Sequence, residues 1–286
     1  MIKINQIRPQ DNKFTQIIST IAVVPKKLYY IGDLPAERVP TVAIVGTRKP
    51  TPYGKEVTER LAAELASRGI VIVSGLALGI DAIAHRAALD AGGTTIAVQA
   101  NGLAKIRPFT NRQLGEDIIK GGGAILSEYE PNEIPFLSRF LERNRIVSGL
   151  SDAVLITEAS ARSGSLNTAR NALEQGREVF VVPGNITSPS SAGCNLLLRQ
   201  GATPVTKVED ILEVITPHLL EPQTRLALGD NPTQVTIINQ LQAGIRDGDE
   251  LQRLSGVSAG DFATELTIME INGIVRGLGA NQWTLR

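Results

Sequence analysis

Cysteine and histidine are scarce in this sequence of 286 residues. Cys194 is the single cysteine, so the chain cannot form an internal disulfide bond. The two histidines, His85 and His218, are far apart in the sequence. A zinc site usually takes three or four ligands from cysteine, histidine and carboxylate side chains. Because these residues are so few, we expect no bound metal and no cofactor.

Long apolar runs and an excess of one charge are also missing. No apolar run approaches the ~18 residues of a membrane span, and the N-terminus, MIKINQIRPQ, lacks the apolar core of a signal peptide. Together with the single cysteine, these features predict a cytoplasmic protein without a membrane span. The 29 basic and 29 acidic residues cancel, which excludes a general polycation but leaves room for a local basic groove.

Arginine outnumbers lysine among the basic residues, with 20 arginines and 9 lysines. One explanation is a compositional bias of the host. The other is a need for the planar guanidinium fork, which suits bidentate contacts to phosphate.

The regular feature of the sequence is an alternation of apolar runs with helix-like segments. Seven apolar runs of strand length occur, at residues 42–46, 71–75, 95–99, 124–128, 153–159, 178–184 and 203–206. Helical spacing separates nearly all of them, and continuous apolar strands alternating with helices are typical of a parallel sheet covered on both faces. The sequence therefore predicts an α/β fold with a doubly wound, mostly parallel Rossmann-like sheet. In such a fold the ligand lies at the carboxyl ends of the strands.

This pattern divides the chain into four segments. We expect a short irregular segment that packs on the core at residues 1–40, the Rossmann-like domain at 41–215, a linker at 216–230 and a winged-helix-like domain at 231–286. The last prediction rests on three short helical stretches followed by a hairpin pattern, VRGLGANQWTLR. Residues 231–286 carry four arginines and six acidic residues, so we expect this module to serve packing or protein contact rather than DNA binding.

Glycines and arginines follow several of the predicted strands. Gly46, Thr47 and Arg48 come after the first run, and Arg162 precedes Ser163, Gly164 and Ser165 after the fifth. Glycine lets backbone amides approach a ligand closely, and amides beside a helix start suit phosphate. The spacing matches neither the G-x-G-x-x-G fingerprint nor a Walker A loop. These turns predict a site for a polyanion.

The segment FLSRFLERNRIVSG, residues 136–149, adds a cluster of arginines before the fifth strand. Arg143, Asn144 and Arg145 form an R-N-R motif within it, and Arg139 lies one helical turn earlier. The segment is either a phosphate-contacting face or a solvated helix face that carries Glu142. In the loop IRPFTN, Phe109 and Asn111 either contact a base or pack against the protein.

A catalytic reading of the chain has little support. Asp81 precedes His85 by four residues, so the pair either forms part of a triad or consists of a helix-capping Asp81 that holds His85 against the sheet. The serines lie in R-S-G-S-L, which is not a nucleophile elbow. We expect Ser165 or Asn167 to cap the following helix instead, and we expect that the protein is not an enzyme.

Several long motifs closely resemble the DNA-processing protein A family (DprA/Smf). They are VAIVGTRKPTPYG, VIVSGLALGIDAIAH, ERNRIVSGLSDAVLITEASARSGSLNTA, GREVFVVPGN and LLLRQGATPV. The resemblance covers about residues 25–286. It implies a Rossmann-like core that binds single-stranded DNA, acts as a homodimer and loads RecA onto incoming DNA during natural transformation. It implies no catalytic activity.

The resemblance also points to particular residues as one DNA-binding face. They are Gly46, Thr47, Arg48, Arg107, Phe109, Asn111, Arg143, Asn144, Arg145, Ser163, Gly164, Ser165 and Thr168. The chain departs from the family pattern at Arg107, where a tyrosine usually precedes Pro108, and at Phe140-Leu141, where Phe-Pro is usual. Only about 40 residues precede the first predicted strand, so we expect most of the helical domain that is common at the N-terminus of the family to be absent.

Two other functions remain as alternatives. One is a nucleotide-processing enzyme on a related scaffold, such as a nucleoside-monophosphate phosphoribohydrolase. Those enzymes typically have a P-G-G-x-G-T loop and a catalytic glutamate, whereas ASARSGSLNTA replaces the loop here and Glu158 is the nearby acid. The other is a partner-binding module with an idle pocket.

Overall fold

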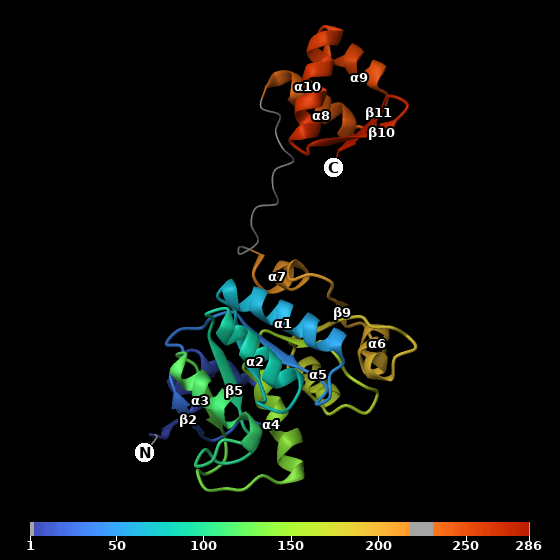
Figure 1. Cartoon of the computed structure of the whole chain (residues 1–286). Helices are drawn as coiled ribbons and strands as arrows, with labels where there is room; N and C mark the ends of the chain where they lie inside the picture. Colours follow the sequence, from blue (N-terminus) through green and yellow to red (C-terminus); the bar gives the residue numbers. More distant parts are fainter. Residues whose placement is uncertain (1–2, 218–230, 286) are drawn as a thin grey trace. The chain divides into compact units, whose positions relative to one another are not determined.

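The computed structural model describes residues 3–217 and 231–285. The chain forms two compact units, residues 1–219 and 220–286, and each is described by itself. The first unit is built on a nine-stranded sheet with the strand order β1-β2-β6-β5-β4-β3-β7-β8-β9 (Figure 1).

The centre of this sheet is parallel and matches the seven predicted strands. They are β3 (Thr41–Val45), β4 (Val71–Ser74), β5 (Thr95–Val98), β6 (Ala124–Ser127), β7 (Ala153–Ile156), β8 (Glu178–Val181) and β9 (Thr203–Pro204). Every residue of β3 to β7 is buried, as expected for strands covered on both faces. The predicted doubly wound, mostly parallel sheet is confirmed.

The N-terminal segment differs from the irregular structure that we predicted. It contributes two strands, β1 (Asn5–Ile7) and β2 (Leu28–Gly32), and β2 pairs antiparallel with β6. Residues 1–40 therefore extend the sheet at one edge and do not merely pack on it. The short, mixed sequence of β1 has no clear period of its own, which is why the pattern was missed.

Helices cover both faces of the sheet. The connections form α1 (Pro52–Ser67), α2 (Ile80–Asp90), α3 (Arg112–Lys120), α4 (Leu137–Gly149), α5 (Ser165–Glu174), α6 (Ala192–Arg199) and α7 (Glu209–Ile215). One hydrophobic core joins α4 and α5 to the sheet, and another joins α3 to the opposite face. Thr51 starts α1 as an N-cap, since its side chain accepts a hydrogen bond from the Gly54 amide at 3.2 Å.

The order of the strands places a crevice beside β3. The chain runs outward from β3 through β4 and β5 to β6, then returns to β7 on the other side of β3. Val45 of β3 is in register with Ile156 of β7, so the loops that follow both strands leave the sheet at the same edge. Open α/β sheets bind ligands at such a switch point.

The second unit contains three helices and a hairpin. They are α8 (Pro232–Gln242), α9 (Gly248–Ser255), α10 (Ala259–Ile271), β10 (Val275–Gly279) and β11 (Gln282–Leu285). Ile237, Leu251, Phe262 and Met269 lie in its hydrophobic core. These are the elements of a winged helix, in the predicted order. Most of the predicted linker, residues 218–230, lies outside the described residues.

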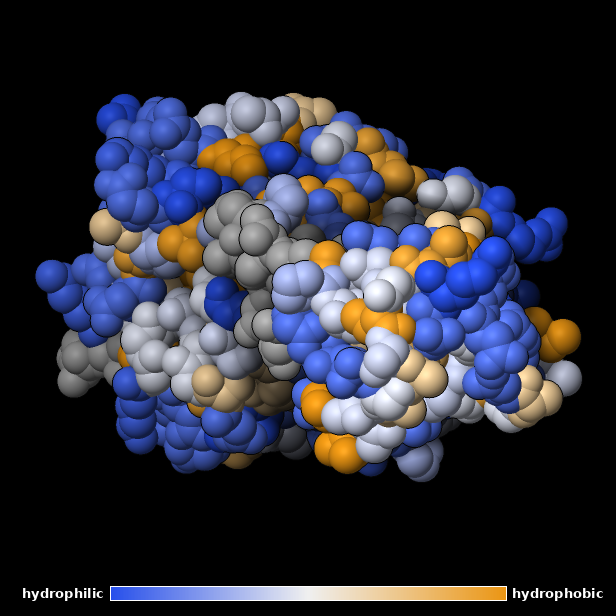
Figure 2. Space-filling model, turned by 90° about the horizontal axis from the view of Figure 1, so that it is seen from above, coloured by the Kyte–Doolittle hydropathy of each residue, from blue (hydrophilic) through white to orange (hydrophobic). Residues whose placement is uncertain are grey.

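The surface mixes polar and apolar residues. In the view of Figure 2, apolar residues are scattered among hydrophilic ones. None of the helices within the described ranges combines the length and apolar character that crossing a bilayer requires.

Candidate functional site

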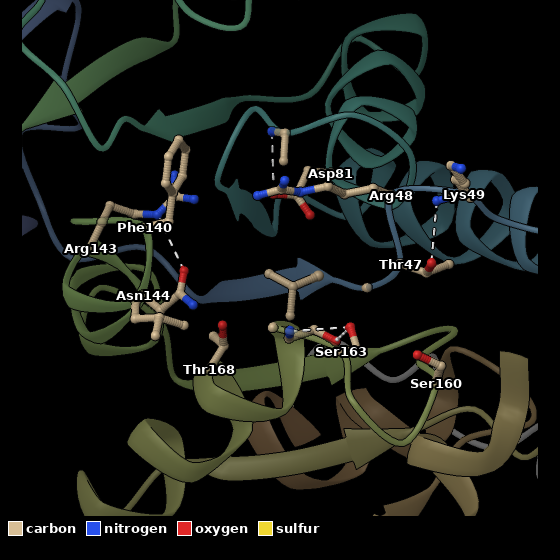
Figure 3. A pocket seen from close by; sticks show the side chains of 16 residues that line it. Thr47, Arg48, Lys49, Asp81, Phe140, Arg143, Asn144, Ser160, Ser163 and Thr168 are labelled. Carbon is tan, nitrogen blue, oxygen red and sulfur yellow. Dashed lines mark hydrogen bonds between the residues drawn. The ribbon is translucent and has the colours of Figure 1, made fainter. Parts of the chain in front are cut away.

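A cavity of about 440 Å³ lies at the switch point of the sheet, and we call it the strand-end cavity. It brings together nine of the predicted site residues, namely Gly46, Thr47, Arg48, Arg143, Asn144, Ser163, Gly164, Ser165 and Thr168. Figure 3 shows Arg48, Asn144 and Ser163 reaching this space from three different elements. The residues come from the loop after β3, from α4, and from the loop and helix after β7.

The loop after β3 is fixed by Glu158. The Thr47 amide donates to the Glu158 carbonyl oxygen at 2.8 Å, and the Thr51 amide and hydroxyl donate to the two carboxylate oxygens at 2.8 and 2.7 Å. Gly46 is required here, because a Cβ atom would lie 2.7 Å from the Glu158 carbonyl oxygen. Glu158 thus holds the loop in place, and the side chains of Arg48 and Lys49 extend outward from it.

Those two side chains, Arg48 and Lys49, are the exposed cations of the cavity. The Arg48 guanidinium lies 5.6 Å from the centre of the Phe140 ring. No ion pair involves either residue within the described parts of the chain. Cations without an acidic partner are available to a polyanion, so this pair gives the cavity its positive charge.

Arg143 is a different kind of cation, because it is buried and already bonded. Its side chain donates to the carbonyl oxygen of Gly75 at 2.8 Å and to that of Val98. Only 5% of the residue is exposed. A Cβ atom on Gly75 would lie 2.5 Å from the guanidinium, so glycine is needed there. Arg143 therefore ties the loop after β4 to the end of β5 and lines the cavity with its buried charge.

Asp81 balances this buried charge. Its carboxylate accepts hydrogen bonds from the Gly75 amide at 3.1 Å and the Ala77 amide at 3.4 Å. Burial raises the pKa of Asp81, and the charge of Arg143 opposes the rise. Burial likewise lowers the pKa of Arg143, and Asp81 opposes that shift. A guanidinium remains charged in a protein, so the charge of Arg143 acts on Asp81 through the interior, although no ion pair joins the two side chains among the described residues.

The loop Ser163–Ser165 forms the opposite wall. Ser163 and Ser165 share a hydrogen bond between their hydroxyls at 2.7 Å, and the Ser165 amide donates to the Ser163 hydroxyl at 3.3 Å. The prediction that Ser165 or Asn167 caps α5 is wrong, because Gly164 is the N-cap and makes no side-chain cap bond. A Cβ atom on Gly164 would meet nothing within 4 Å, so this residue borders open space.

Arg145 does not face the cavity. Its guanidinium forms a bidentate ion pair with Glu128 at 2.9 and 2.6 Å. Residues two apart on a helix point about 200° away from each other, so Arg143 and Arg145 must diverge. The prediction that both arginines of the R-N-R motif line one face is wrong for Arg145.

Two further predicted residues, Arg107 and Phe109, line an adjoining cavity of about 320 Å³. This Phe109 cavity shares Arg48, Phe140 and Arg143 with the strand-end cavity. Phe109 is 69% exposed, so its ring is free to stack with a ligand. Arg107 is exposed and brings a charge to this rim.

Asn111 has a structural role in the described chain. Its side-chain amide donates to the carbonyl oxygens of Leu76 and Ala77, both at 3.0 Å. It borders neither the strand-end cavity nor the Phe109 cavity. The residue therefore fixes the loop after β4 and reaches the site only indirectly.

No arrangement expected of a hydrolase is assembled from the predicted candidates. His85 shares a 2.7 Å hydrogen bond with the Thr95 hydroxyl, and Asp81 bonds loop amides instead of holding His85 or capping α2. Burial lowers the pKa of His85 to about 3, so the ring is neutral. Both carboxylate oxygens of Glu158 are engaged by Thr51. In the described ranges, no three His, Cys, Asp or Glu residues gather as a metal site would require.

Sequence reasoning missed several residues that line the strand-end cavity, among them Lys49, Asp81 as a partner of the loop amides, and Phe140. The signal for Phe140 was available, because it lies three and four positions before Arg143 and Asn144 and so shares their helix face. The sequence suggested Asp81 only as a partner of His85, and no pattern pointed to its bonds with the loop amides.

Comparisons with known proteins agree with this geometry. The model of a family described as DNA recombination-mediator protein A matches residues 5–216. The chain is 38% identical to the Escherichia coli protein Smf over 97% of this chain and 77% of that protein. It is 43% identical to the Bacillus subtilis DNA processing protein DprA over 73% of this chain and 71% of that protein.

Two solved structures are similar as well. The DprA of Streptococcus pneumoniae aligns with a TM-score of 0.69 and 40% identity, covering 74% of this chain and 75% of that one. The DNA processing protein A of Helicobacter pylori, a structure that concerns its single-stranded DNA binding mode, aligns with a TM-score of 0.67 and 37% identity. That alignment covers 76% of this chain and 97% of the other.

Proposed function

This chain belongs to the DNA recombination-mediator protein A family, and from that premise we propose that it binds single-stranded DNA without sequence preference. The observation that carries the proposal is the pair of unpaired cations, Arg48 and Lys49, beside the open space at Gly164. The backbone phosphate is the common element of all DNA sequences, and arginine contacts it through charge-assisted hydrogen bonds.

We assign separate roles to the site residues in this proposal. Arg48 holds a backbone phosphate, with Lys49 in support and the loop at Gly164 close to the phosphate oxygens. Phe109 stacks on a base in the adjoining cavity, and Arg107 contacts a neighbouring phosphate. Arg143, Asp81 and Asn111 keep the loops in position. Arg145 makes no direct contact in this scheme.

We further propose that the bound strand is passed to the RecA recombinase during natural transformation, in the cytoplasm, by a homodimer. The likeness to the DprA proteins supports this step. Its test is RecA assembly on single-stranded DNA with and without the protein. Faster assembly is expected, and unchanged assembly despite normal DNA binding would exclude the mediator step.

The proposed role is not catalytic. The phosphoribohydrolase alternative needs an acid that is free to act, whereas Glu158 is 2% exposed and bonded to Thr51. Release of free base from a nucleoside monophosphate would contradict this assignment.

A salt series with matched single- and double-stranded oligonucleotides tests the central proposal. We expect preferential binding of the single strand, with an affinity that falls linearly on a double-logarithmic salt plot by about 0.7 per phosphate contact. Equal affinity for single- and double-stranded oligonucleotides, or an affinity that does not depend on salt, would contradict the proposal.

A further inference from the structure

A third cavity, of about 910 Å³, adjoins the Phe109 cavity on the side of the N-terminal strands, and we call it the Lys105 groove. Arg107 and Phe109 line both, so the two spaces meet along these side chains. Since the Phe109 cavity also shares Arg48 with the strand-end cavity, the three spaces lie one beside the next on the unit.

The floor of the Lys105 groove is apolar and belongs to the folded core. Ile31 and Leu103 are each 3% exposed and pack with Ile106 in one hydrophobic cluster, against which Ile4 also packs. This packing, together with the pairing of β1 on β2, brings the chain start beside the loop that follows β5. Lys3 therefore reaches the groove because Ile4 is anchored next to it.

The rim of the groove is basic and largely without acidic partners. Lys3, Lys105 and Arg107 are exposed, and none of them takes part in an ion pair across residues 3–217 and 231–285. Arg112 pairs with Glu116 at 2.9 Å, and this glutamate is the one acid among the lining residues.

The acids of the nearby loop are already neutralised. Glu130 pairs with Lys27 at 2.5 Å, and Glu133 pairs with Arg139. Their charge is therefore balanced locally and does not offset the lysines of the rim.

We infer that the Lys105 groove is an additional single-strand binding segment. The DNA strand held in the strand-end cavity continues past Phe109 into this groove, where its sugars and bases cover the apolar floor and Lys3 and Lys105 contact its phosphates. A positively charged groove that also offers an aromatic ring for base stacking is the combination that tracks single strands, and here Phe109 supplies that ring. The inference rests on the proposed function, because the groove receives a strand that Arg48 already holds.

Two oligothymidylates, of about 6 and about 20 nucleotides, separate the groove from the primary site. The short probe fills the strand-end and Phe109 cavities, and the long one also reaches the groove. The test variant is the double substitution Lys3→Ala and Lys105→Ala in the full chain. The matched control is Lys120→Ala. Lys120 is an exposed lysine at the end of α3, close to the start of β6 and therefore at the amino ends of the parallel strands, away from the loop that follows β5.

The double variant is expected to bind the long probe about tenfold more weakly than the unaltered protein, with a salt slope smaller by about 1.4, since each lost phosphate contact removes about 0.7. Its affinity for the short probe stays unchanged, and Lys120→Ala changes neither probe. Arg48→Ala weakens both probes.

Two results would contradict the proposal that the Lys105 groove binds the DNA strand. One is unchanged binding of the long probe by the double variant, as expected if the groove instead takes an acidic peptide. The other is equal weakening of both probes. In either case a strong effect of Arg48→Ala leaves the proposed function standing. If Arg48→Ala changes neither probe, the proposed function itself fails.

Discussion

The strand ends of the first unit and the surface of the second unit use their charges in opposite ways. Arg48 and Lys49 extend from a rigid loop without acidic partners, beside an open space at Gly164. In the second unit, Arg253 lies 3.6 Å from Glu250, and six acidic residues outnumber four arginines over 231–286. A winged helix often reads DNA with its third helix. Here α10 carries Asp261, Glu265 and Glu270 and no basic residue.

What separates the two regions is that, among the described residues, the first gathers cations without acidic partners at one cavity, whereas in the second Arg276 is also without an ion pair but lies in a module with more acids than arginines. We therefore expect affinity for a polyanion to depend on unpaired cations that are gathered in one place, and not on the count of arginines. Arg143 and Arg145 make the same point within one helix. Arg143 donates its hydrogen bonds to two carbonyl oxygens, and Arg145 forms an ion pair with Glu128. Neither side chain is therefore as free to contact a phosphate as that of Arg48.

We expect the largest effect from Arg143→Met, which lowers the free energy of unfolding. Removing the guanidinium takes away the nearby positive charge that favours the ionised form of the buried Asp81 and leaves two carbonyl oxygens without their donor, which costs about 3 kcal/mol of unfolding free energy. Urea denaturation measures the loss. The double variant with Asp81→Asn is expected to recover part of it, and a fully additive double variant would show that the two charges do not interact.

The next prediction concerns how the stability of each unit depends on pH. His85 is buried with its pKa lowered to about 3, whereas residues 231–286 contain no histidine. The unfolded chain takes up a proton at His85 as the pH falls through about 6.5, but the folded chain does not. The contribution of His85 to the stability of the first unit is therefore complete above pH 6.5 and is lost as the pH falls below it, by about 1.4 kcal/mol per pH unit, or about 2 kcal/mol between pH 6.5 and 5.

Thermal unfolding between about pH 5 and 6.5 checks this sign. His85→Gln should remove that part of the slope, and the second unit should show no such dependence there. A slope that persists in the variant would assign the proton to another group.

Gly164→Leu tests the open wall of the cavity. Gly164 adopts helical backbone angles, with φ −62 and ψ −20, and a side chain would enter empty space. We expect about tenfold weaker binding of single-stranded DNA, equivalent to about 1.4 kcal/mol, with unchanged thermal stability. Gly69→Leu is not a suitable control, because Gly69 has φ +79. Leu173→Ala, on the exposed side of α5, is expected to leave DNA binding unchanged.

The smallest effect is expected in the second unit. Arg253→Ala should change the affinity for single-stranded DNA by less than about twofold, because this arginine is flanked by Glu250 and an excess of acids. Fluorescence anisotropy resolves such a difference. A tenfold loss would show that the second unit contributes to the DNA interface despite its charge.

Much of this arrangement could be predicted from the sequence, for physical reasons. Continuous apolar runs such as 42–46 are diagnostic of buried parallel strands, and parallel strands bring their carboxyl-end loops together. The convergence of Gly46–Arg48 with Ser163–Ser165 follows from that topology alone. The partners of the side chains do not follow from it: helical spacing separates Arg143 from Arg145, but only the fold shows that Arg143 bonds Gly75 and Val98 and that Arg145 pairs with Glu128.

The sequence pattern also could not predict the edge of the sheet that β1 and β2 form. β1 has three residues of mixed polarity, and its existence depends on pairing with β2, which depends in turn on β6. Such nonlocal pairing leaves no periodic trace in a short segment. For the same reason the position of Lys3 beside Lys105 became visible only in the fold.

The salt dependence of single-strand binding by Arg48→Ala, measured beside Arg145→Ala, tests most directly the claim that unpaired cations at the strand ends bind the phosphates. The account predicts that Arg48→Ala lowers the affinity at least about tenfold and reduces the salt slope by about 0.7, and that Arg145→Ala leaves the slope unchanged. An unchanged slope in Arg48→Ala, or an equal reduction in both variants, would contradict it.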